Sequence, residues 1–586
     1  MRIIALLAGV AVSCSPADNA DGLPSGVWAP GVHNQAVETV LGQVAHGGSE
    51  YLTQWHSLEV DRLRSDAPEV LGDFRDALFV STPSHFFVPL ESSEQKRVLK
   101  TAVRRDQGHN QKPLHCEVFW NGGDDQLLSL AKLTWDAAPK VISEEWRDLE
   151  VEVPMQAGRL EFVTRDPVLG GQSSSGLTVA WQAPWVGSLD QGQNGGVQPY
   201  PDVLLLSIDT FRADALDRAP GLKSWVEQGQ LWSNAVSPSN WTLPSYASLF
   251  TGLAANEHGA GRGSFALEAS GEIEDRRLTP IRTDRPTLAQ QFRQRGYATA
   301  MIHQSPMLES WTGFANGFER YLRLNDQTDV ALQHAQDWWR QNQGRPRFLV
   351  LQLMAPHLPY RFGPGPDPLA ELDLVEFFLE DHTPEQRKKF FDLSEADRQI
   401  VRQRYDEEVR RMDNELRPWL ETLLPSSARP ESAPNWIFAL HSDHGEEFWE
   451  QQSFEHGHSF DDSVIRVPIA IVAPGRLQPM LSNADVPAHG IGGTVLAVAG
   501  ISQDWPSRID QAPDSVLSNM PFYRADSGGR RFAASGEEQL PFRPMLNSGG
   551  QQAAISVDKM KMLEELGYLA AKDETWDNSD QAPGNK

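Results

Sequence analysis

The spacing of hydrophobic and polar residues changes along the chain near residue 187. Before that point, short runs of β-branched and aromatic residues lie between Gly, Asp and Pro, which is typical of antiparallel strands. These runs are residues 77–80, 115–120, 127–135, 149–154, 159–164 and 177–181. We therefore predict an all-β sandwich, of jelly-roll type, over residues 71–186.

After a linker at 187–201 rich in Gly, Gln and Pro, strand-like runs alternate with helix-like runs. The expected strands are residues 203–208, 298–303, 348–353, 436–441 and 467–473. Clear helices are expected at 286–296 and at 394–424, the second opening with the capping pattern Ser394 to Asp397. This alternation predicts an α/β domain with a mostly parallel sheet over 202–510, followed by a C-terminal extension with a disordered tail over 511–586.

The first residues have the character of a targeting segment. Residues 1–14 carry one Arg and a short apolar run that ends at Cys14, which is typical of a bacterial lipoprotein signal peptide. An ordinary signal peptide with an incidental Cys is the alternative. Residues 15–70 would then form a tether and an N-terminal extension. We expect a lipid anchor and a place in the bacterial cell envelope, at the outer membrane or in the periplasm.

Composition limits the functions of the chain. At 586 residues it is too long for a single core, and its net charge of −27 argues against general nucleic-acid binding. It contains two Cys residues, so only Cys116 remains after the signal segment, and a disulfide within the folded part is excluded. Cys116 lies in an apparent strand, where a buried, unreactive thiol is expected.

Three residues follow apolar runs at places where a metal could bind. Asp209 comes directly after 203–208, and Asp443 and His444 come just after 436–441. The carboxyl ends of parallel strands share one edge of a sheet, so two carboxylates and an imidazole would meet there. Such a set suits Mn²⁺, Zn²⁺, Mg²⁺ or Ca²⁺. Taken singly, each residue favours a helix cap or a turn, whereas together with the Thr motif described next they favour a metal.

A Thr and several His residues extend this site. Thr242 precedes a helix-like run, LPSYASLFTGL, where a hydroxyl would lie with free N–H groups that bind anions. Simple N-capping by Thr242 is the alternative. His258, His357, His456 and His458 lie in loops around the same edge and are candidates to bind an anionic ester or to protonate a leaving oxygen. Each of them alone could be structural.

Five motifs in order resemble the sulfatase branch of the alkaline phosphatase superfamily. They are DTFRAD, TLPSYASLFTG, YDEEVRRMD, SDHGEEF and IRVPIAIVAPG, and the similarity covers about residues 201–500. The resemblance implies an alkaline-phosphatase-like α/β/α fold and makes Asp209, Asp443 and His444 ligands of one divalent metal. It places Thr242 at the nucleophile position and His357 and His458 at the ester, with His258 and His456 as weaker matches. Ca²⁺ is the usual metal of the family, and the His ligand makes Mn²⁺ or Zn²⁺ an alternative.

The sequence departs from the family pattern at the nucleophile. Thr242 replaces the Cys or Ser that is oxidised to formylglycine, Tyr246 replaces the supporting Arg, and Thr210 replaces a second metal-binding Asp. We therefore expect no formylglycine and predict a metal-dependent hydrolase of a sulfuric or phosphoric ester, acting on a small-molecule, glycan or lipid ester. The alternatives are an inactive scaffold that binds glycan through its β-sandwich and a phospho-group transferase of the same superfamily.

Overall fold

The computed structural model describes residues 70–533 apart from internal gaps. The gaps are 76, 82–83, 95, 106–112, 124–126, 136–145, 166–177, 183, 189–199, 263–277, 282–285, 371–391, 426–433, 451–453, 458–459, 503, 512–516, 520–522 and 527–530. The predicted signal peptide and tether therefore lie outside the described residues, as do His458 and the predicted tail. Among the described helices, none is both long and apolar enough to cross a bilayer.

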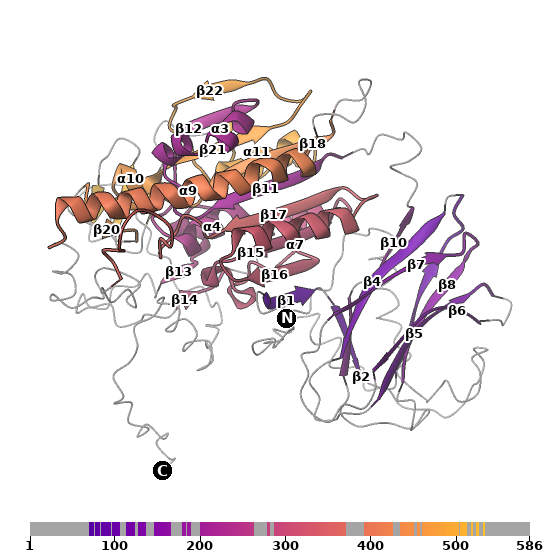
Figure 1. Cartoon of the computed structure of the whole chain (residues 1–586). Helices are drawn as coiled ribbons and strands as arrows, with labels where there is room; N and C mark the ends of the chain where they lie inside the picture. The colour runs from indigo at the N-terminus through magenta and orange to yellow at the C-terminus, as the bar shows by residue number, and fades with distance from the viewer. Residues whose placement is uncertain are drawn as a thin grey trace, which may run out of the picture.

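A nine-stranded sheet forms the centre of the larger unit (Figure 1). Its strands, in spatial order, are β1 (Val70–Arg75), β16 (Arg320–Leu324), β15 (Ala298–His303), β17 (Arg347–Leu353), β11 (Asp202–Ile208), β18 (Trp436–Ser442), β21 (Arg466–Val472), β12 (Gln230–Val236) and β22 (Met480–Ser482). The five strands from β16 to β18 run parallel, while β1 and β21 are antiparallel to their neighbours. All five strands predicted after residue 201 are present, and the sheet is mostly parallel as expected.

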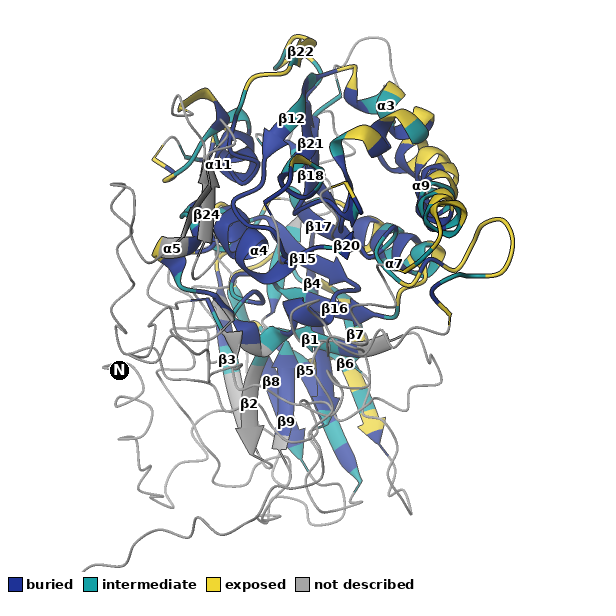
Figure 2. Ribbon diagram, turned by 90° about the vertical axis from the view of Figure 1, so that its left-hand side faces the viewer, coloured by how far each residue is buried: buried dark blue, intermediate teal, exposed yellow. Residues whose placement is uncertain are grey.

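Helices cover both faces of this sheet. Side chains of β11 alternate between two cores: Val203 and Leu205 pack on one face, Leu204 and Leu206 on the other. The first core includes residues of α4 (Thr242–Thr251), α6 (Leu288–Arg293) and α11 (Gly490–Val498). The second includes residues of α3 (Pro220–Val226), α7 (Thr328–Gln341) and α9 (Glu395–Leu423). Figure 2 shows the buried strands between these helices, which confirms the predicted α/β/α class.

The two predicted helices form close to their expected limits. α6 covers the centre of 286–296, with Thr287 accepting a hydrogen bond from the Gln290 amide at its start. α9 begins after Ser394, whose hydroxyl accepts a hydrogen bond from the Asp397 amide at 3.2 Å, as the capping pattern predicts.

Short elements complete the large unit. The helices are α5 (Ala255–His258) and α10 (Asp462–Ile465), with 3₁₀ turns at Ala213–Arg218, Pro306–Leu308, Ser310–Thr312 and Ile509–Gln511. The strands are β13 (Gly261–Arg262), β14 (Leu278–Thr279), β19 (Glu447–Phe448), β20 (Phe454–Glu455), β23 (Leu517–Asn519), β24 (Tyr523–Asp526) and β25 (Arg531–Ala533).

The smaller unit is a sandwich of two antiparallel sheets. One sheet contains β2 (Ala77–Ser81), β4 (Arg97–Arg105), β7 (Arg147–Val153), β9 (Thr178–Gln182) and β10 (Trp185–Ser188). The other contains β3 (Ser84–Leu90), β5 (Leu114–Asn121), β6 (Leu127–Trp135) and β8 (Gly158–Arg165). Cys116, Trp120, Trp135 and Trp181 lie in the core between the sheets, so the thiol is buried as expected and these three indoles are unavailable as sugar platforms.

The boundary between the units differs from the prediction. Residues 71–75 were expected at the start of the sandwich, but β1 pairs with β16 at the edge of the large sheet. Asp73 strengthens this pairing through an ion pair with Arg320 at 3.1 Å. A run of strand-forming residues shows that a strand forms but not which strand it pairs with, so this assignment depended on the tertiary structure.

Candidate metal centre and nucleophile

The two parallel strands β11 and β18 bring the predicted ligands together. Ile208 and Ser442 are partners in the register of these neighbouring strands. Asp209 and Asp443 each follow directly, so both carboxylates emerge at the same level of the same sheet edge. Asp209, Asp443 and the adjacent His444 are fully buried, and each offers a ligand atom within 4.8 Å of the others. The structure thus brings together the three residues predicted to bind a metal.

The buried carboxylates have oxygen atoms without partners. Asp209 Oδ1 and Asp443 Oδ2 are shielded from solvent and make no hydrogen bond. They lie 3.6 Å and 3.3 Å from His444 Nε2. A buried carboxylate oxygen without a donor is costly, and a bound cation would remove that cost. These atoms therefore fit a divalent metal ion.

His444 presents its lone pair to the same point. Its Nδ1–H donates to the carbonyl of Gly445 at 3.0 Å, which leaves Nε2 as the unprotonated nitrogen directed at the carboxylates. Burial and the neighbouring His456 and His357 hold the pKa of His444 well below its usual value, so the ring is neutral at pH 7. A neutral imidazole is the form that binds a metal.

The pKa values of the acidic side chains in the site show that their charged forms are unfavourable without a cation. Burial, followed by the charges of Asp443 and Glu446, raises the pKa of Asp209 well above its usual value. Burial raises the pKa of Asp443 to about 8. Burial also raises the pKa of the neighbouring Glu446 to about 7. A positive ion among these groups would reverse each shift.

Thr242 lies at the start of α4 and beside the metal ligands. Trp241, whose side chain does not cap the helix, occupies the N-cap position, and Thr242 is the first helical residue. The Thr242 hydroxyl is therefore not engaged in capping; its Oγ1 lies 3.3 Å from His444 Nε2. A hydrogen bond from Thr242 also lowers the pKa of Asp443. The predicted nucleophile and the predicted metal ligands thus form one cluster.

The His residues divide into two groups. His357 and His456 are near the cluster, since the ring of His456 lies 4.3 Å from that of His444 and 5.2 Å from that of His357. Glu446 Oε1 lies 2.9 Å from Nδ1 of His456 and orients that ring. His258 is buried behind α4, with Nε2 at 3.1 Å from both the Pro244 carbonyl and the Ser248 hydroxyl. The described hydrogen bonds of His258, with α4 and with the Ala260 amide, do not involve the candidate metal ligands.

The structure adds supporting residues that the sequence analysis did not select. Gln352 donates through Nε2 to Asp209 Oδ2 at 3.3 Å, while its Oε1 accepts from the amides of Gln304 and Ser305. Thr210 adopts a left-handed backbone, with φ 52°, which is rare for a β-branched residue and marks a constrained turn. Tyr405 holds that turn by donating to the Thr210 carbonyl at 2.8 Å.

A second buried network ties together the elements that carry the site. Tyr246 of α4 donates to Ser207 Oγ at 2.6 Å, and Ser207 of β11 lies 2.8 Å from His441 Nδ1 on β18. Polar residues within otherwise apolar strands are the sequence signal for these supporting roles. They occur at Ser207, Gln352 and His441. In the sequence, Tyr246 is only a departure from the family pattern, and its supporting role follows from these contacts.

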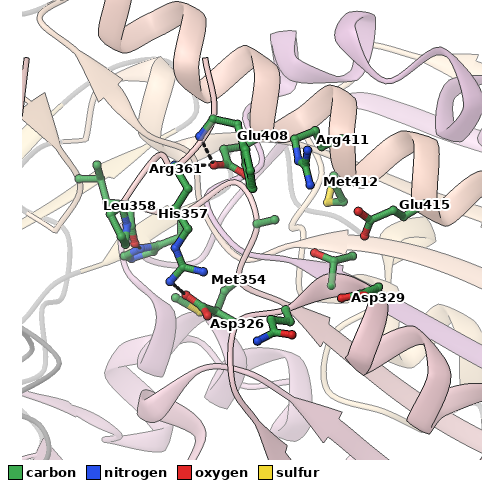
Figure 3. Close-up of a pocket in the computed structure, with 15 residues that line it drawn as sticks. Asp326, Asp329, Met354, His357, Leu358, Arg361, Glu408, Arg411, Met412 and Glu415 are labelled. Atoms are coloured by element: carbon green, nitrogen blue, oxygen red, sulfur yellow. Dashed lines mark hydrogen bonds and ion pairs between the residues drawn. The ribbon is translucent and has the colours of Figure 1, made fainter. Parts of the chain in front are cut away.

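A cavity of about 150 Å³ lies next to His357 (Figure 3). His357 lines this cavity, together with residues of α9 and of the start of α7. The ring of His456 lies between those of His357 and His444, so the cavity is linked to the candidate metal ligands through these two histidines.

The fold and the site define a hydrolase of the alkaline phosphatase superfamily, with a buried Asp-Asp-His group suited to a metal. The sequence profile of the Sulfatase family matches residues 201–501, which is half of the chain, and the chain belongs to this family. No curated protein matches the chain.

Among solved structures, a 2-O GAG sulfatase has a TM-score of 0.43 and 15% identity, over 57% of this chain and 85% of the other. The phosphonate monoester hydrolase of Agrobacterium radiobacter has a TM-score of 0.39 and 16% identity, over 54% of this chain and 80% of the other. A protein of the alkaline phosphatase superfamily from Vibrio parahaemolyticus has a TM-score of 0.38 and 14% identity, over 56% of this chain and 74% of the other.

Proposed function

We propose that the protein is a metal-dependent hydrolase that cleaves a phosphoric or sulfuric ester with Thr242 as its nucleophile. The observation that carries the proposal is the meeting of two buried, unpartnered carboxylate oxygens, Asp209 Oδ1 and Asp443 Oδ2, with His444 Nε2 and the Thr242 hydroxyl.

The donor set is that of a divalent cation. Two carboxylates are hard oxygen ligands, and the imidazole favours Mn²⁺ or Zn²⁺ over Ca²⁺ or Mg²⁺. A cation held by Asp209, Asp443 and His444 would lower the pKa of a neighbouring hydroxyl and offset the negative charge of the ester. Gln352 fixes Asp209 in the orientation that directs its second oxygen to this point.

The protein side chains supply the remaining chemistry. Thr242 Oγ would form a bond to the central phosphorus or sulfur while the bond to the leaving alcohol breaks. The N-terminal amides of α4, which begins at Thr242, would stabilise the charge of the same anion. His456, oriented by Glu446, or His357 would give a proton to the departing alkoxide. Water then cleaves the Thr242 ester and regenerates the hydroxyl.

The nucleophile favours phosphoric over sulfuric esters. A formylglycine hydrate carries two hydroxyls on one carbon, and the second expels sulfate by breaking the carbon–oxygen bond. Thr242 has a single hydroxyl, so a sulfate ester on it would have to be opened by water at sulfur. A phosphate ester on Thr242 is open to in-line attack by water at phosphorus, the route common in phosphoryl transfer.

Variants of Thr242 test this proposal. With a panel of aryl phosphate mono- and diesters, phosphonates and aryl sulfates, we expect Thr242→Ser to retain measurable kcat/KM and Thr242→Ala to lose about 10²–10⁴-fold, because the nucleophile is removed. Thr251→Ala, at the other end of α4, is the control for disturbance of the helix and should keep its activity. An undiminished Thr242→Ala variant would overturn the role of Thr242. Faster cleavage of aryl sulfate than of every phosphate ester would overturn the preference.

A further inference from the structure

The motif YDEEVRRMD lies at 405–413, in the middle of α9, and supplies neither a candidate metal ligand nor the nucleophile. Several of its side chains are nevertheless buried, among them Tyr405, Glu408, Met412 and Asp413. Met412 packs in the second core of the large sheet, which fixes the helix against the strands. The polar side chains of the motif must therefore find hydrogen-bond partners inside the protein.

Tyr405 holds the turn that follows the metal-binding strand β11. Its hydroxyl donates to the Thr210 carbonyl at 2.8 Å and accepts a hydrogen bond from the Arg212 amide at 3.2 Å. The φ of 52° at Thr210 is unfavourable for a β-branched residue, so the turn needs support from its surroundings. The phenol of Tyr405 provides this support directly after Asp209.

The backbone of Thr210 contacts both carboxylates of the metal cluster. Burial raises the pKa of Asp209 and of Asp443, and hydrogen bonds from the Thr210 backbone act against that rise at both residues. A shift of the turn would move this donor and change the direction in which Asp209 presents its side chain. Tyr405 therefore acts on the candidate metal ligands through Thr210.

A second pair of residues on α9 holds the segment that follows β17. Arg404 donates to the Tyr360 carbonyl through Nε at 3.1 Å and through Nη2 at 2.9 Å. Glu408, one turn further along the helix, accepts hydrogen bonds from the amides of Arg361 and Phe362 at 2.6 Å and 3.1 Å (Figure 3). Backbone groups of three consecutive residues are thus bound to α9.

His357 lies in this segment, between the end of β17 and the residues bound to α9. Its amide donates to the Met354 carbonyl at 2.6 Å, and its Nδ1 lies 2.7 Å from the Leu358 carbonyl. The segment lies close against the helix, since a Cβ at Gly363 would be 2.5 Å from Arg404 Cγ. The path of the backbone around His357 is therefore limited by β17 on one side and by α9 on the other.

We propose that α9 positions the candidate site: Tyr405 sets the turn that orients Asp209 for the metal, and Glu408 sets the segment that presents His357 to the ester. The hydrogen bonds described for Tyr405 and Glu408 are with backbone groups of these loops, so both are positioning residues. Tyr405 acts on metal binding and Glu408 on cleavage. The part that concerns Glu408 rests on the proposed function, whereas the part that concerns Tyr405 does not require turnover.

Metal titration tests the role of Tyr405. Calorimetric titration of the metal-free protein with Mn²⁺, and in parallel with Zn²⁺, should give a Kd for Tyr405→Phe about tenfold above that of the wild type, because the turn loses its support. Glu408→Ala should bind both ions within about twofold of wild type. Asp413→Asn is the structural control on α9. Asp413 accepts hydrogen bonds from the Gly221 and Leu222 amides of α3, so this variant should lose stability but keep its metal affinity.

Cleavage at saturating metal tests the role of Glu408, with the ester of the panel that the wild type cleaves fastest. We expect kcat/KM of Glu408→Ala to fall about tenfold, because the segment that carries His357 loses its acceptor. Glu408→Gln should stay within about threefold of wild type, since its amide oxygen can accept from the same two amides. Tyr405→Phe should approach the wild-type value, because excess metal loads the site. Gln403→Ala, at an exposed position on α9, should match the wild type.

The two measurements distinguish positioning from a general effect on stability. A metal affinity in Tyr405→Phe equal to that in Asp413→Asn would overturn the inference. So would an undiminished kcat/KM in Glu408→Ala, or a loss that Glu408→Gln does not recover, while the proposed function would stand. If the wild type cleaves no ester, the proposed function is wrong and the metal titration alone decides the inference: weaker binding in Tyr405→Phe than in Glu408→Ala supports it, and equal binding overturns it.

Discussion

At the scale of single residues, the candidate site depends on atoms that have no partner within the protein. Asp209 Oδ1 and Asp443 Oδ2 are buried and unbonded, while the second oxygen of Asp209 and the Nδ1 of His444 are each held in a hydrogen bond. The chain therefore orients one free donor atom per residue toward a common point. This is the arrangement expected of residues that bind a metal and of supporting groups that fix their orientation.

Removal of Asp443 should abolish metal binding. Asp443→Ala leaves one carboxylate and one imidazole, too few ligands to retain a divalent ion against dialysis. We expect elemental analysis after dialysis to find about one metal ion per chain in the wild type and almost none in the variant. Asp462→Ala removes a carboxylate that is 77% exposed and should leave the metal content unchanged. Equal metal content in Asp443→Ala and wild type would contradict the site.

At the scale of elements, the Tyr246–Ser207–His441 network joins the three elements that carry Thr242, Asp209 and Asp443. Ser207 and His441 each precede an Asp by two residues on β11 and β18, and Tyr246 lies one turn beyond Thr242 on α4. Tyr246, in the position of the family's Arg, thus contacts the strands beneath the site and not the reacting group. Its phenol fixes the helix against the sheet edge.

Loss of the Tyr246 hydroxyl should loosen this junction. Tyr246→Phe removes a buried hydrogen bond, and we expect it to lower the free energy of unfolding by about 1–2 kcal/mol and to weaken metal affinity measurably. Tyr297→Phe is a matched control, because the Tyr297 hydroxyl donates to the Pro201 carbonyl at 2.8 Å, away from the metal ligands. Denaturant unfolding should show similar losses for both variants, whereas metal titration should show a loss only for Tyr246→Phe. Equal metal affinity in both variants would show that the network serves stability alone.

At the scale of the whole molecule, buried neutral histidines link stability to pH. Burial lowers the pKa of His258, His303 and His441 to about 3 and that of His489 to about 4. The unfolded chain binds protons at these residues below pH 6.5, whereas the folded chain does not. Each histidine therefore costs stability as the pH falls from 6.5 toward its folded pKa, by about 1.4 kcal/mol per pH unit.

A histidine outside the metal cluster isolates this effect. In His303→Gln we expect the loss of unfolding free energy between pH 6.5 and 4.5 to be smaller than in the wild type by about 2–3 kcal/mol. Urea unfolding of the metal-free wild type and variant at several pH values measures this loss of unfolding free energy. The difference between their unfolding free energies at pH 8 gives the effect of the substitution on packing alone. Parallel pH curves for both proteins would contradict a neutral, buried His303.

The sequence by itself determined five of the nine strands of the large sheet, the helices α4, α6 and α9, and which residues would meet at the sheet edge. The apolar runs were long and regular enough to define strands, and chemistry-bearing residues at their carboxyl ends must meet when the strands are parallel neighbours. The sandwich followed from its short β runs in the same way, although β3, β4 and β10 were not predicted. Within the cluster, the strand-end positions of Asp209, Asp443 and His444 predicted that they would meet, and the resemblance to the sulfatase family placed Thr242 with them.

The tertiary structure decided what depends on contacts between distant residues. It assigned β1 to the large sheet, because strand propensity does not specify a partner. It set His456 and His357 beside His444 and placed His258 behind α4, since the direction of a loop residue follows from packing and not from its neighbours in sequence. It also revealed the supports of Asp209 and Tyr246 and the acidic cavity at His357, which are formed by side chains distant from one another in the sequence.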